Sequence, residues 1–401
     1  MQLTQDVEFI ISRLEERGYR ADVVGGPVRD FLRGHTPSDY DITTSALPDE
    51  IKAAFSDMRT VDTGIKHGTV TLILGGAGYE ITTYRIDGEY RDSRHPESVS
   101  FTSDIEEDLA RRDFTMNAIA YSHRFGITDP FFGREDIKSK IIRAVGDPNK
   151  RFSEDALRIL RALRFASCLG FSIEKQTKEA VFSKAHLLKN ISAERIYSEW
   201  IKLLSGERAY EVITEYRDVI SVFLPELSEL RMPSAHAFSA AEVDVRQMSL
   251  FYLSCGEECA DKFALAMRRL KTDSDTRRLG ERVLSCVGKF ERSTSAQIGR
   301  MLMDIGVSYA KKVVALEETL GIGDGDGINK IDEYISSGEP YLLSHLAIGG
   351  DELREIGFSG ADIGEALSYL LLQTVEKKIK NDERELLARA MELFRHKTQK
   401  K

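Results

Sequence analysis

The sequence feature that most constrains the fold is a change of pattern near residue 153. Before it, short β-rich runs alternate with helical stretches: Ala21 to Val24 is typical of a strand, and Asp6 to Arg17 carries apolar residues at helical spacing. After it, helical periodicity continues with almost no β-rich runs. We therefore expect an α+β N-terminal part, a small mixed sheet with helices, followed by an all-α remainder.

Length and composition bound the classes of protein that fit. At roughly 100 to 200 residues per domain, 401 residues predict two to four domains, and 42% hydrophobic residues can bury a sizeable core. Neither a run of about 18 apolar residues nor a signal-peptide pattern is present, so we expect a cytoplasmic protein without a membrane segment. The four cysteines are too scattered for a disulfide framework.

The formal net charge of −9 argues against a basic coat for nucleic acid over the whole surface. Any such surface must be local, and two stretches qualify. Residues 141–170 hold six Lys or Arg against three acids, and residues 371–401 hold nine against five. A local excess of this kind can attract a polyanion, but a solvated helix face produces the same pattern.

The strongest chemical signal is a glycine turn followed by two aspartates. Gly25 and Gly26 lie between the expected strand and a helix starting at Pro27, where a backbone without Cβ atoms can approach a phosphate closely. Asp39 and Asp41 fall on the next expected strand, residues 39–44, and two-residue spacing puts both on one face. Such carboxylates repel each other unless divalent cations lie between them, although a solvated strand edge is the simpler alternative.

In this order and spacing, the two elements resemble the signature of the polymerase-β-like nucleotidyltransferase superfamily. The resemblance implies metal-binding aspartates, Mg²⁺ as cofactor, and a third carboxylate on a neighbouring strand. Glu80 is the candidate, because residues 79–84 are expected to pair with residues 69–74 in a hairpin across a turn at residues 75–78.

A second charged segment precedes an apolar helix start. Arg111 and Arg112 suit a triphosphate, and Asp113 with Asn117 suits a sugar, since guanidinium binds phosphate bidentately and amides bind hydroxyls. A surface ion-pair cluster is the alternative reading. The segment resembles the second motif of tRNA nucleotidyltransferases and bacterial poly(A) polymerases, as does the downstream run at residues 129–133.

A third segment indicates how a base could be selected. If Ser153 caps one continuous helix, then Asp155, Arg158 and Arg161 share a face, while Leu157, Leu160 and Leu163 turn to the core. A carboxylate beside a guanidinium accepts from the amine of cytosine or adenine and meets the carbonyl of uracil or guanine unfavourably. In an arbitrary helix, the same spacing is an ordinary surface salt bridge.

Residues 154–166 are very similar to the amino-acid template motif of class II CCA-adding enzymes, and residues 191–196 resemble the helix-supporting motif that follows it. The family pattern usually has Pro and Gln where this chain has Ala156 and Cys168, and neither position belongs to the reading pair. The resemblance is specific over about residues 20–205 and weak beyond. Together with the other motifs, it implies nucleotide contacts from Gly25, Gly26, Arg29, Arg111, Arg112, Asp113, Asn117, Asp155, Arg158, Arg161 and Arg164.

The resemblance also implies a division of the chain and a set of partners. We expect a nucleotidyltransferase head at residues 1–140, a helical neck at 141–205, a body at 206–320 and a tRNA-binding tail at 321–401, with a glycine-rich loop at 321–327. The expected partners are the 3′ acceptor end of tRNA, CTP and ATP. The sequence assigns neither the tRNA-contacting residues nor the oligomeric state.

Two segments bear on which family member this is. Residues 87–99 are charged and flanked by turn residues, which favours a loop that full CCA-adding and A-adding enzymes retain and CC-adding enzymes lack. Residues 63–70 look like the CCA-adding form rather than the basic signature of bacterial poly(A) polymerases. CCA addition is the leading interpretation. The alternatives are an A-adding enzyme, a bacterial poly(A) polymerase and, from another class, a catalytically dead RNA-binding homologue.

Overall fold

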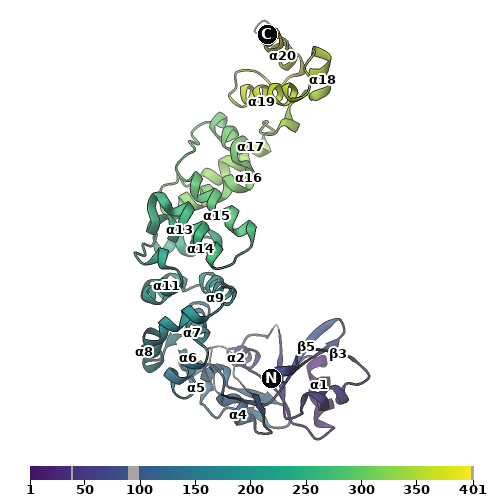
Figure 1. Ribbon diagram of the computed structural model, residues 1–401, viewed down its shortest axis with the longest axis vertical. Helices are drawn as coiled ribbons and strands as arrows, with labels where there is room; N and C mark the ends of the chain where they lie inside the picture. The colour runs from purple at the N-terminus through teal and green to yellow at the C-terminus, as the bar shows by residue number, and fades with distance from the viewer. Residues whose placement is uncertain (38, 89–98, 399–401) are drawn as a thin grey trace. The chain divides into compact units, whose positions relative to one another are not determined.

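The computed structural model describes residues 1–37, 39–88 and 99–398. Its internal contacts divide the chain into two compact units, Met1–Ser228 and Glu229–Lys401. Figure 1 shows that the sheet lies wholly in the first unit, and that the ribbon from α6 onward is almost entirely helical. The expected order of an α+β part followed by helices is confirmed. The expected four-part division stays a prediction.

The N-terminal sheet has seven strands in the order β3-β4-β5-β2-β1-β8-β9. Only β2 and β5 run parallel within it, so the sheet is mixed as expected. The strands are β1 (Ala21–Val24), β2 (Asp41–Thr44), β3 (Arg59–Gly64), β4 (Thr69–Leu74), β5 (Ala77–Thr83), β8 (Ala120–Ser122) and β9 (Gly126–Thr128). A separate hairpin joins β6 (Arg85–Asp87) to β7 (Val99–Phe101).

Helices cover the sheet and shape its edges. The first helix, α1, begins where the Thr4 hydroxyl accepts from the Val7 N–H, and it buries Val7, Ile10, Ile11 and Leu14 at helical spacing. The next helical elements, up to α5, are α2 (Gly26–Leu32), α3 (Pro48–Ala54), the 3₁₀ turn η1 (Ile65–His67), α4 (Ile105–Ala110), the 3₁₀ turn η2 (Thr115–Asn117) and α5 (Gly133–Ser139).

Two strand boundaries differ from those expected. Strand β2 begins at Asp41, not Asp39, because Asp41 pairs with Val24 and the partner strand then turns away at Gly25. The β4–β5 turn has only two residues, Gly75 and Gly76, not four. Both have positive φ, which a two-residue hairpin turn favours, and β5 therefore already starts at Ala77.

The continuous helix expected from Ser153 is also wrong. Helix α6 (Pro148–Glu154) ends before Asp155, and α7 (Leu157–Leu169) begins after it. Asp155 has extended backbone, with φ −136° and ψ 102°, and its carboxylate accepts from the Leu157 N–H. The side chain thus caps α7 instead of continuing α6, which is what Asp commonly does at a helix start.

The rest of the first unit is helical apart from a two-stranded pairing of β10 (Ile141–Ile142) with β11 (Ser172–Ile173), which the sequence did not predict. Leu157, Leu160 and Leu163 are buried on α7, as expected. The following helices are α8 (Lys175–Lys184), α9 (Ala193–Ser205), α10 (Ala209–Glu215) and α11 (Arg217–Phe223).

The second unit is built from helices throughout its described residues. The long α16 and α17 are joined by a loop that starts at the left-handed Gly321, where the glycine-rich loop was expected. Among the described helices, none combines the length and apolar character that a membrane span requires. The helices are α12 (Ala235–Ala240), α13 (Val243–Cys255), α14 (Cys259–Arg269), α15 (Ser274–Cys286), α16 (Ser295–Leu320), α17 (Gly327–Ser336), α18 (Gly350–Ile356), α19 (Ala361–Val375) and α20 (Glu383–Thr398).

Candidate active site

A pocket of about 190 Å³ lies where the sheet meets the segment after α4. The carboxylates of Asp41 and Glu80 line it from β2 and β5, and Arg111 and Arg112 line it from the far side. Val24 also lines the pocket and belongs to a cluster of buried apolar residues. The pocket therefore brings acidic and basic side chains together beside this cluster.

The parallel pairing of β2 with β5 explains why two of the carboxylates meet. Ile42 lies opposite Ile81, so the preceding residues, Asp41 and Glu80, occupy neighbouring positions at the start of the paired segment. Asp41 is exposed, but the protein around its carboxyl raises its pKa by desolvation. The nearby Arg112 lowers the pKa, and the negative charges of Asp39 and Glu80 raise it, so that the net shift is upward. Crowded carboxylates of this kind favour a bound cation.

Asp39 is exposed and lies two residues before β2, outside the strand. Its influence on the Asp41 pKa places it in the same electrostatic environment. Within residues 1–37, 39–88 and 99–398, no three His, Cys, Asp or Glu side chains already converge as a closed metal site. Open sites of one or two carboxylates, completed by substrate phosphates, are usual for Mg²⁺.

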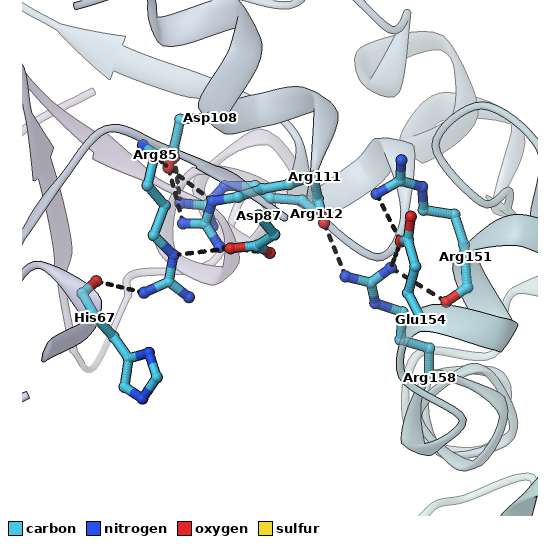
Figure 2. Close-up of polar contacts among 9 residues, drawn as sticks. All are labelled: His67, Arg85, Asp87, Asp108, Arg111, Arg112, Arg151, Glu154 and Arg158. Atoms are coloured by element: carbon cyan, nitrogen blue, oxygen red, sulfur yellow. Dashed lines mark hydrogen bonds and ion pairs between the residues drawn. The ribbon is translucent and has the colours of Figure 1, made fainter. Parts of the chain in front are cut away.

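The two arginines of the far wall are held by one buried acid, Asp108 (Figure 2). Arg111 donates to its Oδ1 from Nε and Nη2, at 2.9 and 2.8 Å, and Arg112 donates to Oδ2 at 3.2 Å. Burial alone would raise the pKa of Asp108, but the two guanidinium charges outweigh it and the pKa is lowered. Asp108 is thus ionised and fixes both cations beside the pocket.

The glycine turn approaches this wall closely. Gly25 has φ +79° and ψ −127°, and its N–H donates to the Ile119 carbonyl at 3.1 Å. A Cβ atom at Gly25 would lie 3.2 Å from Nη1 of Arg112. The backbone conformation therefore favours glycine here, and the contact leaves little room for a side chain. Gly26 is the first residue of α2 and lies beside Arg29.

Four predicted residues form one chain of hydrogen bonds from α2 to α7. Arg29 donates to Oδ1 of Asn117 at 2.7 Å, Asn117 donates to Asp113 at 3.0 Å, and Arg161 donates to the other oxygen of Asp113 at 2.7 Å. Burial raises the pKa of Asp113, but Arg161 and Asn117 outweigh it and lower the pKa to about 2. None of the four lines the pocket. Their hydrogen bonds join the second motif to the neck.

Arg164 lies apart from this chain. It pairs with Glu199 of α9 at 2.7 Å and stacks 3.9 Å from the centre of the Phe165 ring. Arg29 also approaches this ring, 5.1 Å from its centre. Arg164 thus ties α7 to α9 and does not line the acidic pocket.

Asp155 and Arg158 come from adjacent turns but each has a different partner. Arg195 donates to Oδ2 of Asp155 at 2.9 Å, while Oδ1 caps Leu157 at 3.0 Å. Arg158 donates to Glu154 at 2.9 Å. Asp155 and Arg158 therefore do not lie on one continuous helix, because the helix is broken at Asp155.

Arg158 also reaches back to the second motif. It is buried, and its Nη2 donates to the backbone carbonyl of Arg111 at 2.8 Å, as Figure 2 shows. Its Nη1 donates to the carbonyl of Arg151 at 3.2 Å. Arg158 is thus anchored against the same segment that supplies the arginines of the acidic pocket.

The residues that sequence reasoning did not assign are the partners: Asp108, Glu154, Arg195 and Glu199. Asp108 precedes Arg111 and Arg112 at helical i,i+3 and i,i+4 spacing, a signal that could have found it. Arg195 and Glu199 are at least 35 residues from their partners in sequence, so no local pattern reveals those contacts.

The expected loop at residues 87–99 is described only at its ends. Asp87 and Val99 pair across the β6–β7 hairpin, and Arg85 and Arg111 both approach the Asp87 carboxylate, at 3.2 and 3.8 Å. Residues 89–98, on which the loop prediction depends, lie outside the described residues.

Comparison with known families matches two segments of the chain. Residues 21–143 match the poly A polymerase head domain, and residues 170–230 match the family described as the probable RNA and SrmB-binding site of polymerase A. The first match contains the glycine turn, all three carboxylates and the Asp108 cluster.

Whole-chain relatives extend the similarity to both units. A CCA-adding enzyme of Geobacillus stearothermophilus is 36% identical over 99% of this chain and 98% of its own length. One from Ligilactobacillus salivarius is also 36% identical, over 97% and 96%. The crystal structure of the Bacillus stearothermophilus CCA-adding enzyme in complex with CTP is 33% identical, covers 99% of both chains and has a TM-score of 0.80.

Proposed function

The chain belongs to the family of CCA-adding enzymes, which are nucleotidyltransferases, and from this we propose that it adds C, C and A in turn to the 3′ end of tRNA without a nucleic-acid template. In each step the terminal 3′-oxygen of the tRNA attacks the α-phosphorus of CTP or ATP. The bond from that phosphorus to the β-phosphate oxygen breaks, and pyrophosphate leaves.

Enzymes of this family use divalent metal ions, and we propose Mg²⁺ here, held by Asp39 and Asp41 with Glu80 in support. The crowding that raises the Asp41 pKa supports this assignment, because two neighbouring carboxylates and a partly desolvated third fit hard cations better than they fit one another. The bound ions would activate the 3′-hydroxyl and neutralise the leaving pyrophosphate.

The triphosphate is proposed to bind between the glycine turn and the arginine wall. Gly25 and Gly26 allow close approach of the backbone, while Arg111 and Arg112 supply charged donors already fixed by Asp108. Pre-positioned donors stabilise the charge that develops on the phosphates without needing to reorganise.

The predicted residues outside that pocket are proposed to complete the nucleotide site from the neck side. The hydrogen-bonded chain through Asp113 and Asn117 would orient the sugar, and it would keep Arg29 and Arg161 fixed. Arg164, paired with Glu199, would hold α7 against α9. These roles follow from where the side chains are anchored.

Base selection is assigned to Asp155 and Arg158. Asp155 retains acceptor capacity on both oxygens beyond its contacts with Leu157 and Arg195, and Arg158 lies one turn along the chain. Cytosine and adenine each offer an amine to the carboxylate and a ring acceptor to the guanidinium, whereas uracil and guanine do not.

The helices after the neck are proposed to bind the tRNA. The body at residues 206–320 and the tail at 321–401 are proposed to hold the acceptor arm through shape and phosphate contacts. Because tRNA, CTP and ATP are all required, we propose a cytoplasmic location.

The decisive experiment uses tRNA ending one, two or three nucleotides short of CCA, with each labelled nucleoside triphosphate in turn. We expect C, C and A to be added in order, addition to stop after A, and UTP and GTP to be rejected. Addition of A alone would identify an A-adding enzyme, and long A tracts would identify a poly(A) polymerase. Incorporation that persists after replacing Asp41 would favour the dead homologue with a contaminating activity.

A further inference from the structure

A second hollow in the first unit shares no lining residue with the acidic pocket. It is an open groove of about 1030 Å³ between the end of α2, the start and end of α5, and the segment after α7. We call it the α5 groove. Its functional groups are Arg33, His35, Phe132, Arg134, Lys138 and Lys140.

Four of the five basic side chains of the α5 groove are not neutralised by the described residues, whereas the fifth, Arg33, pairs with Asp30 at 3.3 Å. Those of His35, Arg134, Lys138 and Lys140 form no hydrogen bond or ion pair with another described residue, and all four are exposed. The groove has two acids, and one of them, Asp129, is committed to the start of α5, where it accepts from the N–H groups of Gly133 and Arg134 at 2.7 and 3.0 Å. A net positive field therefore remains in the groove.

This contrasts with the basic stretch that the sequence suggested for RNA. Five of the six cations in residues 141–170 are paired with acids of the same unit, so they hold the fold together. These pairs are Arg143–Asp136, Arg151–Glu154, Arg158–Glu154, Arg161–Asp113 and Arg164–Glu199. Around α5, by contrast, the side chains of Arg134, Lys138 and Lys140 have no partner among the described residues.

The groove also presents a fixed aromatic ring. Phe132 is 68% exposed and has φ 58°, an unfavourable conformation for a residue with a side chain. The next residue, Gly133, has no room for a side chain, because a Cβ atom there would lie 2.1 Å from the Thr115 carbonyl oxygen. The chain is therefore packed tightly against η2 at this point, and the bend at Phe132 is maintained by its surroundings.

The other end of α5 repeats this feature. Lys140 has φ 55°, and among the described residues only four non-glycine residues have positive φ. Two of them bracket this one short helix and line this one groove. At Lys140 this conformation ends α5 as its C-cap, and the exposed ring of Phe132 and the unpaired cation of Lys140 thus lie at the two ends of α5 on the same groove.

We propose that the α5 groove binds an unpaired nucleotide of the tRNA substrate, with the base stacked on Phe132 and the adjoining phosphates held by Arg134 and Lys140. An aromatic face with spread cations matches single-stranded nucleic acid, since every base can stack and every phosphate attracts a cation. The groove is open and its cations are dispersed, which suits a chain better than a single triphosphate. The inference rests on the proposed function, because that function supplies the RNA.

The test measures binding of tRNA lacking CCA by fluorescence anisotropy over a range of salt concentrations. Arg134→Glu and Lys140→Glu should each weaken binding about tenfold at 0.1 M salt, and each should flatten the slope of log K against log salt by about 0.7, the value for one single-strand phosphate contact. Phe132→Gly, which suits the positive φ, should weaken binding about tenfold with the slope unchanged, and Phe132→Tyr should bind as the wild type does.

Arg59→Glu is the matched control, because Arg59 is exposed on β3 and has no partner among the described residues. Equal losses in Arg59→Glu and the groove variants, or changes below about twofold in the groove variants, would overturn the proposal. Binding of CTP without RNA should be unchanged in every variant. Nucleotide addition by the wild-type protein is measured in parallel. If the wild-type protein binds tRNA but adds no nucleotide, the proposed function fails. If the groove variants bind tRNA as the wild type does, only the groove proposal fails.

Discussion

The acidic pocket and the neck segment that follows it carry their charges in opposite ways. Around Asp41, desolvation raises the pKa of the carboxyl group, Arg112 lowers it, and the like charges of Asp39 and Glu80 raise it further. In the neck, Asp155 and Arg158 each have an opposite partner, Arg195 and Glu154. One region thus retains unfavourable repulsion, whereas the other is already neutralised.

This difference predicts how each region meets its ligand. Repulsion between carboxylates is relieved when a cation enters, so the acidic pocket gains stability on binding. The neck pairs gain no such relief, and a base must add hydrogen bonds to groups that already have partners. Substitutions should accordingly affect catalysis in the first region and selectivity or stability in the second.

The largest effect should follow from Asp41→Asn. The change removes one negative charge from the proposed metal site at nearly constant size, and loss of metal stabilisation worth several kcal/mol predicts at least about a 10³-fold drop in kcat for CMP addition. Single-turnover kinetics with saturating tRNA would measure it. The melting temperature should not fall, since the substitution relieves repulsion. A variant that keeps more than a tenth of wild-type kcat would contradict the role given to Asp41.

A smaller effect, on selectivity, is expected from Arg158→Ala. Loss of one base-reading donor is worth about 1–3 kcal/mol, so the preference for CTP over UTP in kcat/KM should fall about 30-fold. Arg151→Ala is the matched control, because Arg151 also pairs with Glu154, at 3.0 Å, but has no proposed contact with the base. If both variants lose selectivity equally, Arg158 acts only through the fold.

Asp113→Asn tests the link between the two regions. The folded-state pKa of about 2 lies below the ordinary 3.8, so the carboxylate stabilises the fold above pH 3.8, and this contribution disappears as pH falls through about 2. The variant should lose about 2 kcal/mol of unfolding free energy at pH 7, and the difference from wild type should shrink below pH 3.

Denaturant unfolding at several pH values would measure this difference. Asp218→Asn is the control, since Asp218 is 81% exposed and its ion pair with Arg217 should contribute little. A difference between Asp113→Asn and wild type that is independent of pH would show that the loss comes from altered packing instead.

The same contrast explains how far the sequence could predict the site. The sequence correctly placed Glu80 beside Asp41. Strand pairing and the regular geometry of a sheet determine which residues become neighbours, so spacing along the sequence was informative here. The continuous helix through Asp155 was wrong, because the Asp155 side chain accepts from the N–H of Leu157 and α7 starts there as a new helix.

The number of charged residues in a segment of the sequence did not show which of those charges are paired in the structure. The cations at residues 141–170 were visible in the sequence, yet their acidic partners on distant elements were not, for example Glu199 for Arg164. The unpaired cations of the α5 groove come from two separate segments that only the fold brings together. The carbonyl of Thr115 that fixes Gly133 is likewise a tertiary contact with no local signature.

The smallest effect is predicted for Arg195→Ala, and it separates orientation from chemistry in the neck. Arg195 contacts Asp155 at 2.9 Å from α9, and the pair is partly exposed, with side-chain exposures of 30% and 18%. Losing it leaves Asp155 held by the Leu157 N–H alone, so the carboxylate is less well oriented but still present. We expect KM for CTP to rise about fivefold, a loss of about 1 kcal/mol, with kcat within twofold of wild type.

Arg195→Lys should recover only part of the loss, because a single ammonium holds a carboxylate with less directional precision than a guanidinium does. A fall in kcat with unchanged KM would instead place Arg195 in the chemical step. The neck would then contribute to catalysis directly, as only the acidic pocket is expected to do.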